Sequence, residues 1–92
     1  MNPVTTVFPD PSLERVIERF PNRKSLIERE YARSESFHSL CDDWLVCSDA
    51  FLRWRSVEGS LAQSRRSEYR TLMAELEREM VFWLKCVADP TE

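Results

Sequence analysis

The chain has 92 residues, of which 42% are hydrophobic and 32% are charged, with a formal net charge of −3 and a single glycine. This length allows one domain with a modest core, and the composition excludes a disordered chain. One glycine is too few for the turns of a sheet protein, and strong helix formers dominate from Ser12 onward. We therefore expect an all-α fold, with residues 1–92 forming one helical domain.

The patterns of charge and hydropathy disfavour several classes of partner. No run of Lys and Arg exceeds two residues, so no basic stripe is present to bind a nucleic-acid backbone. No apolar run approaches the roughly 20 residues that span a bilayer, and the N-terminus lacks the pattern of a signal peptide. Three cysteines, an odd number, favour reduced thiols over a disulfide framework. We expect a cytoplasmic protein without nucleic-acid or membrane partners.

Residues 1–9 are predicted to form an extended arm because they contain Pro3 and Pro9. Residues 10–33 are predicted to form two short helices. Asp10 is a good N-cap and Pro11 a good first residue for the first helix, which Pro21 should end. The apolar residues of this helix are Leu13, Val16, Ile17 and Phe20.

The second short helix is predicted from an N-cap at Asn22 to about Ala32. Its apolar residues are Leu26, Ile27 and Tyr31, and its charged residues, including Glu30, are expected to face solvent. Ser34 or Ser36 should cap the helix that follows.

Residues 34–92 predict a long antiparallel helical hairpin. The first helix, over residues 35–57, carries apolar residues at every heptad step. These are Phe37, Leu40, Trp44, Cys47, Phe51 and Trp54. The second helix, predicted from Ser64 to Val87, carries a matching series. These residues are Tyr69, Met73, Leu76, Met80, Trp83 and Val87. The linker is predicted over residues 58–63 with Gly59 at a C′ position, and so short a connection forces an antiparallel pair.

The hairpin has more apolar surface than one helix pair can use. A second surface around Cys41, Leu45 and Leu52 should meet either the short helices or another subunit. Because those helices are short, we expect two copies to pack face to face as a four-helix bundle, in a homodimer or a higher closed oligomer. The N-terminal arm would pack in cis or be exchanged between subunits.

The order of elements resembles the YdcH-like family of small, uncharacterised bacterial proteins. The matching positions lie between residues 26 and 84. They are Leu26 and Ile27, Phe37 and Leu40, and the segment Leu76-Glu77-Arg78-Glu79-Met80. The additional N-terminal segment and the three tryptophans depart from that family. The resemblance implies a helical hairpin that pairs with itself or a partner, and it implies no activity.

The residues that could carry chemistry are few. His38, Cys41 and Asp42 share the i, i+3, i+4 spacing of one helix face, and their side-chain types can bind zinc. However, Cys41 also fits a buried core position, and the chain lacks Cys-x-x-Cys pairs. Glu35 and His38 form one Glu-x-x-His motif of the kind found in di-iron bundles. We expect no bound cofactor or metal and no catalytic residue.

Other polar and thiol groups are interpreted as structural. Cys47 is expected to be fully buried and Cys86 to lie unreactive near a helix C-terminus. Glu75 and Glu79 are expected to form a surface of ion pairs with Arg78. Four arginines should gather at the loop end of the hairpin, where an anionic partner would bind. They are Arg53, Arg55, Arg65 and Arg66.

Two functions of different class follow from these patterns. The first is a self-associating interaction or structural module without catalysis, with Cys41, Leu45, Leu52 and the four arginines as candidate contact residues. The alternative is a small metal- or ligand-binding bundle centred on His38, Cys41 and Asp42.

Overall fold

The computed structural model describes residues 11–88, and its helices account for nearly all of them. The elements in chain order are α1 (Pro11–Arg19), a 3₁₀ turn η1 (Pro21–Arg23), α2 (Lys24–Arg33), α3 (Glu35–Arg55) and α4 (Ser60–Ala88). No strand occurs among these residues, so the all-α prediction is confirmed. The predicted arm, the cap at Asp10 and the stop at Asp89-Pro90 lie outside the described residues.

The junction between α1 and α2 differs from the prediction. Pro21 follows α1, as expected, but it opens the turn η1 instead of leaving Asn22 to cap a helix. The N-cap position of α2 is Arg23, which makes no side-chain capping hydrogen bond. Because the 3₁₀ turn leads directly into α2, no polar cap is needed where Asn22 was expected to act.

Ser34 joins α2 to α3 and acts as the predicted cap. Its backbone is extended, and its Oγ accepts a hydrogen bond from the backbone N–H of Phe37 at 3.2 Å. Its own N–H donates to the carbonyl of Glu30 at 2.9 Å. One residue therefore ends α2 and starts α3, which fixes the angle between them.

The loop of the hairpin is shorter than predicted. It comprises residues 56–59, and α4 begins at Ser60 and not at Ser64. Gly59 has a φ of 113° and its carbonyl accepts from the N–H of Gln63 at 3.1 Å, so it precedes α4 and is not the C′ residue of α3. A left-handed residue is needed where the chain reverses, and glycine adopts it without a steric penalty.

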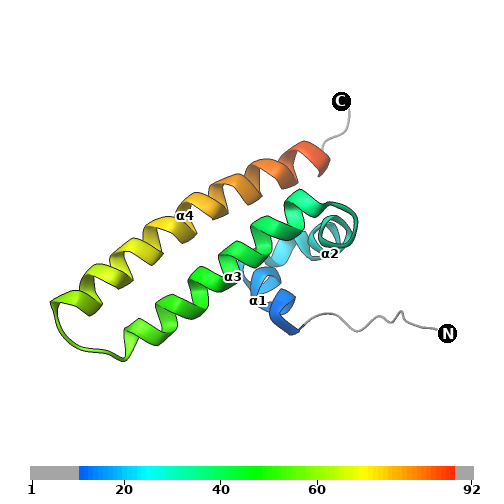
Figure 1. Ribbon diagram of the computed structural model, residues 1–92. Coiled ribbons are helices and arrows are strands. Elements are labelled where there is room, and N and C mark those ends of the chain that lie inside the picture. Colours follow the sequence, from blue (N-terminus) through cyan, green and yellow to red (C-terminus); the bar gives the residue numbers. More distant parts are fainter. Residues whose placement is uncertain (1–10, 89–92) are drawn as a thin grey trace.

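The two long helices lie side by side and antiparallel, and this confirms the hairpin (Figure 1). All twelve residues of the two heptad series are buried or half-buried. The helices α1 and α2 lie against the end of the hairpin away from the loop, mainly on α3. The loop end extends beyond them.

The core lies where the short helices meet the hairpin. Its buried members come from all four helices. They are Leu13, Val16, Ile27, Phe37, Cys41, Trp44, Leu45, Met80 and Leu84. Toward the loop, α1 reaches as far as Ser48 and Asp49, to which Arg15 donates hydrogen bonds, the one to Asp49 at 2.6 Å. We call the part of the hairpin packed by α1 and α2 the covered half and the rest the loop half.

Candidate interaction surface

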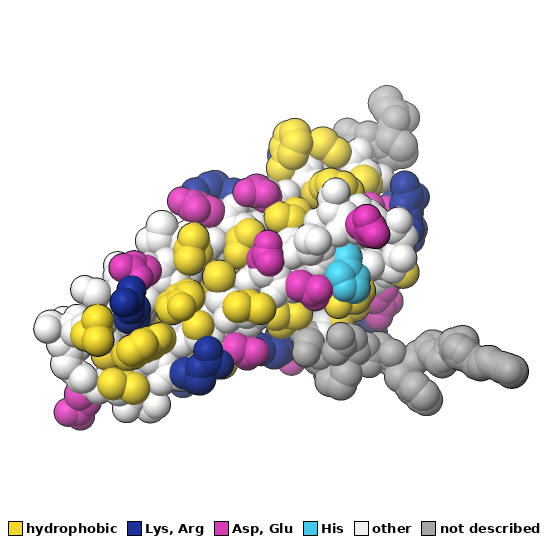
Figure 2. Space-filling view, viewed as in Figure 1, with side chains coloured by type: hydrophobic (Ala, Val, Ile, Leu, Met, Phe, Trp, Pro, Cys, Tyr) yellow, Lys and Arg dark blue, Asp and Glu magenta, His cyan; other side chains and the backbone are white. Residues whose placement is uncertain are grey.

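Several large hydrophobic side chains remain exposed among the described residues. They are Val46, Leu52, Val57, Leu61, Leu72, Val81 and Phe82. Phe82 and Val46 are the most exposed, at 69% and 65%. Figure 2 shows hydrophobic side chains in a band along the hairpin, with acidic side chains beside it. Single exposed apolar residues are ordinary, but apolar side chains gathered along two helices make this face a candidate contact surface.

A groove between α3 and α4 runs along this band. Two adjoining hollows of about 810 Å³ and 300 Å³ share the side chains of Glu75 and Glu79. We call the combined feature the acidic groove. Its apolar lining residues are Leu40, Val46, Cys47, Leu72, Leu76, Phe82 and Trp83. No residue of α1 or α2 lines it, so this face of the hairpin, which we call the open face, lacks the cover that those helices give elsewhere.

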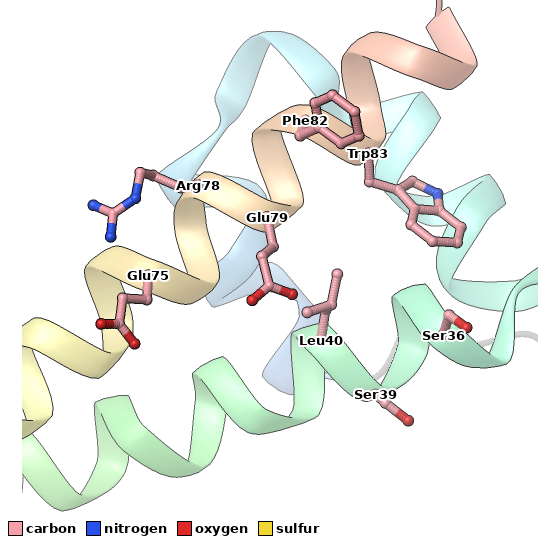
Figure 3. Close-up of a pocket in the computed structure, with 8 residues that line it drawn as sticks. All are labelled: Ser36, Ser39, Leu40, Glu75, Arg78, Glu79, Phe82 and Trp83. Atoms are coloured by element: carbon pink, nitrogen blue, oxygen red, sulfur yellow. The ribbon is translucent and has the colours of Figure 1, made fainter.

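The charged residues that line the groove are three carboxylates, those of Asp43, Glu75 and Glu79, and one cation, Arg78, so its net charge is negative. Figure 3 shows Glu75 and Glu79 extending from α4 toward α3, whereas Arg78 extends away. Within residues 13–88 none of the three carboxylates forms an ion pair or a side-chain hydrogen bond. The expected pairing of Glu75 and Glu79 with Arg78 is therefore wrong, because the arginine lies on the outer side of α4.

Behind the groove, Glu77 links three helices. Arg19 of α1 donates to it through Nε and Nη2 at 3.0 and 2.8 Å, and Nε1 of Trp44 on α3 donates at 2.9 Å. The hydrogen bond and charge of Glu77 raise the pKa of Arg19 above its ordinary value. A bidentate Arg–carboxylate pair holds its geometry well, so this link fixes α4 against α1 and α3.

Glu30 forms a second link, between α2 and α4. Its side chain is 1% exposed and accepts from Nε1 of Trp83 at 2.9 Å, with Arg29 at 3.3 Å and Arg33 at 3.5 Å. The hydrogen bond from Trp83 is the main cause that lowers the pKa of Glu30, and the two arginines add to it. The expectation that Glu30 faces solvent is wrong. Two features of the sequence could have predicted that Glu30 is buried. It lies three residues after Ile27 on the same face of α2, and the indole N–H of a buried tryptophan needs an acceptor.

The residues of the predicted metal set do not converge. His38 stacks on Tyr31 with ring centroids 4.0 Å apart, and its Nε2 lies 3.1 Å from Oδ2 of Asp42. Tyr31 donates its hydroxyl to the other oxygen of Asp42 at 3.1 Å. Cys41 instead lies in the core, where burial and then the charge of Asp42 raise the pKa of its thiol to about 12. The described chain contains no group of three or more His, Cys, Asp or Glu side chains that could hold a metal ion.

The predicted contact residues on α3 are divided between the two halves. Cys41 and Leu45 are buried in the core with residues of α1 and α2, as one of the two alternatives expected. Leu52 lies two turns beyond Leu45 on the same side of α3 and is 45% exposed, past the reach of the short helices.

The four predicted arginines flank the loop, but two of them have partners within the chain. Arg66 donates to the carbonyls of Trp54 and Val57 at 2.9 and 3.0 Å, which satisfies backbone groups at the end of α3. Arg65 pairs with Glu68 at 2.9 Å. Arg53 and Arg55 are exposed and form no ion pair among the described side chains.

The cysteines also differ from one another. Cys47 was expected to be fully buried but is half-buried in the acidic groove, because α1 does not reach that side of α3. Burial and then the charge of Asp43 raise the pKa of its thiol. Cys86 is exposed.

None of the described helices combines the length and apolar character needed to cross a membrane. Comparison with protein-family models found no match, and searches of curated proteins and of solved structures found none either. The resemblance to the YdcH-like family therefore stays a prediction.

Proposed function

We propose that this protein is a self-associating helical module that acts in protein–protein interaction or structural assembly, without catalysis and without a cofactor. The observation that carries the proposal is the acidic groove, which is lined by exposed apolar side chains that α1 and α2 leave uncovered. Transfer of one such side chain from water into a contact is worth about 1.5–3 kcal/mol when burial is complete. Packing of a second chain on the open face would recover this free energy.

The polar groups with shifted pKa values support a binding role over a catalytic one. Glu30 and Arg19 are each engaged in a hydrogen-bonded link between helices, and the shifted thiol of Cys41 is buried. Cys47 is half-buried in the acidic groove, but its pKa is raised, which disfavours the reactive thiolate. A catalytic group needs access to substrate and a partner that moves protons. We place the module in the cytoplasm, where three thiols without a disulfide stay reduced.

Light scattering coupled to size-exclusion chromatography tests the proposal. At tens of micromolar we expect the mass of a dimer or higher closed oligomer, and Val46→Asp should shift the protein to a monomer with an unchanged helical circular dichroism spectrum. Val81→Asp is the matched control, since Val81 is also exposed but lines the hollow on the other side of α4. A wild-type monomer at this concentration would overturn the proposal.

A further inference from the structure

We infer that two copies of this chain pack antiparallel through their open faces, with the two-fold axis crossing α4 at Leu72 and α3 at Val46. The inference rests on the proposed self-association and specifies its geometry. In this arrangement α4 lies against α4 of the second copy and α3 against α3, so the four long helices form one bundle. Leu72 and Val46 both line the smaller hollow of the acidic groove, which places them on the same part of the open face.

Three of the four large apolar residues exposed on α4 are spaced almost symmetrically about Leu72, and the fourth, Val81, lies on the other side of the helix. Leu61 precedes it by eleven residues and Phe82 follows it by ten. At 1.5 Å per residue these positions are about 16 and 15 Å from Leu72 in opposite directions. The exposed fractions of Leu61, Leu72 and Phe82 are 60%, 42% and 69%. A two-fold axis at Leu72 therefore sets Leu72 against its own copy and each Leu61 against Phe82 of the other chain.

Two residues of opposite charge on the same face of α4 also lie at equal distances on either side of Leu72. Arg65 precedes Leu72 by seven residues and Glu79 follows it by seven, two helical turns in each direction. Each Arg65 then meets Glu79 of the second copy, and this contact occurs twice. On α3, Arg53 lies two turns from Val46 and comes near the same Glu79, because Ser39 and Glu79 line one hollow. The loop end therefore brings positive charge to the three carboxylates of the acidic groove.

Other alignments bring like charges together. An axis shifted toward Glu75 would place the three groove carboxylates near their own copies. A parallel alignment would place Arg65 beside Arg65 and Glu79 beside Glu79. In the inferred register, Glu68 approaches Glu75 of the second copy. Glu68 is paired with Arg65 of its own chain at 2.9 Å, which offsets this repulsion. Like charges across an interface disfavour an alignment, so charge selects the antiparallel register.

A charge exchange tests this register. Arg65→Glu and Glu79→Arg should each raise the dissociation constant of the dimer about tenfold, because each places like charges at both symmetric contacts. The double variant Arg65→Glu/Glu79→Arg restores opposite charges at both of these contacts and should bind more tightly than either single variant, with incomplete recovery because Arg53 then faces an arginine at position 79. An equimolar mixture of the two single variants should form a heterodimer for the same reason. Lys85→Glu, on the other side of α4, is the control and should leave the dissociation constant unchanged.

Disulfide trapping gives an independent measure of the axis. In a Cys47→Ser/Cys86→Ser background, Leu72→Cys should crosslink to its own copy on oxidation. Leu61→Cys alone should not, since its two copies lie about 32 Å apart, at twice 16 Å from the axis. A mixture of the Leu61→Cys and Phe82→Cys chains should crosslink.

The outcomes separate the register from self-association. Two results would overturn the register and leave the proposed function standing, provided that the wild type is a dimer. The first is a double charge variant whose dimer has a dissociation constant no lower than those of the single variants. The second is a crosslink formed by Leu61→Cys alone. A wild-type monomer at tens of micromolar would overturn both.

Discussion

The covered half and the loop half of the hairpin use the same two helices but bury different side chains. In the covered half, α1 and α2 add a second layer, and large residues such as Phe37, Ile27 and Met80 are fully buried. In the loop half, among the described residues, α3 and α4 pack mainly against each other, and the buried residues there are the alanines Ala50 and Ala62. Two helices can enclose a methyl group between them, whereas a phenyl ring needs a third element.

Polar contacts differ between the halves in the same way. In the covered half, Trp44 and Trp83 donate their indole N–H groups to carboxylates that tie separate helices together. In the loop half the main polar contact is Arg66 with the carbonyls at the end of α3. The comparison shows that α1 and α2 complete the core of the covered half and that, among the described residues, they leave the loop half and the open face uncovered.

The difference in packing should have its largest effect when a phenylalanine is replaced by alanine in the covered half and, separately, on the open face. Phe37→Ala should lower the free energy of unfolding by about 3–5 kcal/mol, because it empties a fully enclosed site. Phe82→Ala removes the same ring from the surface and should change the stability of the monomer by about 0.5 kcal/mol or less. Urea denaturation at concentrations below the dissociation constant measures both. Equal costs would show that the two regions do not differ in packing.

The two partly buried tryptophans give a second matched pair. Trp83→Phe leaves the buried carboxylate of Glu30 without its indole donor and should cost about 1.5–3 kcal/mol. The indole N–H of Trp54, in the loop half, donates no hydrogen bond among the described residues, so Trp54→Phe should cost less than about 1 kcal/mol. Denaturation curves at pH 7 compare the two, and the comparison fails if Trp54→Phe costs as much as Trp83→Phe.

The pH dependence of stability should come partly from the same link. Glu30 has an ordinary pKa of 4.5 when unfolded and a lower pKa when folded. Its contribution is therefore complete above pH 4.5 and is lost as the pH falls through the folded value. Between pH 5 and pH 3 the wild-type protein should lose stability more steeply than Glu30→Gln, as followed by urea denaturation. Parallel pH profiles would contradict the role assigned to Glu30.

The sequence predicts the helices well because their signals are local. Heptad spacing in α3 and α4, Pro21 after α1 and the cap at Ser34 each act within a few residues, and all were predicted. The boundary of α4 was placed four residues late because Gly59 was interpreted as ending α3. A glycine with positive φ can lie at either side of a short loop, and its own position does not tell which.

The features missed from sequence all depend on contacts between distant segments. From the sequence, Glu30 is predicted to be a surface residue of α2. Its burial is explained only by its contact with Trp83, which is 53 residues away along the chain. Glu77 likewise reads as one of three alternating glutamates until Arg19 and Trp44 meet it. The surplus apolar surface around Cys41, Leu45 and Leu52 was predicted to meet the short helices or a second subunit, and α1 and α2 cover Cys41 and Leu45 while Leu52 stays exposed. The acidic groove between α3 and α4 was not predicted.

The loop half should also respond to a change in its only glycine. Gly59→Ala meets no atom within 4 Å, so the cost comes from the backbone φ of 113° alone. We expect a loss of about 1 kcal/mol, because an L side chain is strained in this region of φ. Thermal unfolding measured beside Ala62→Gly, which opens a small cavity in the same half, separates backbone strain from packing. An unchanged melting temperature for Gly59→Ala would show that the loop shifts to relieve the strain.

The three cysteines report on both regions without altering stability. Cys86 is exposed and should react first with a thiol reagent at pH 8, and Cys47 should follow because burial and Asp43 raise its pKa. Cys41, with its pKa near 12 in the core of the covered half, should react only as the protein unfolds. Raising the protein concentration through the dissociation constant should slow Cys47, which lines the acidic groove, and leave Cys41 unchanged. A rate for Cys47 that does not depend on concentration would mean that the second copy leaves the groove open, whereas a fast reaction of Cys41 would mean that the covered half is not closed.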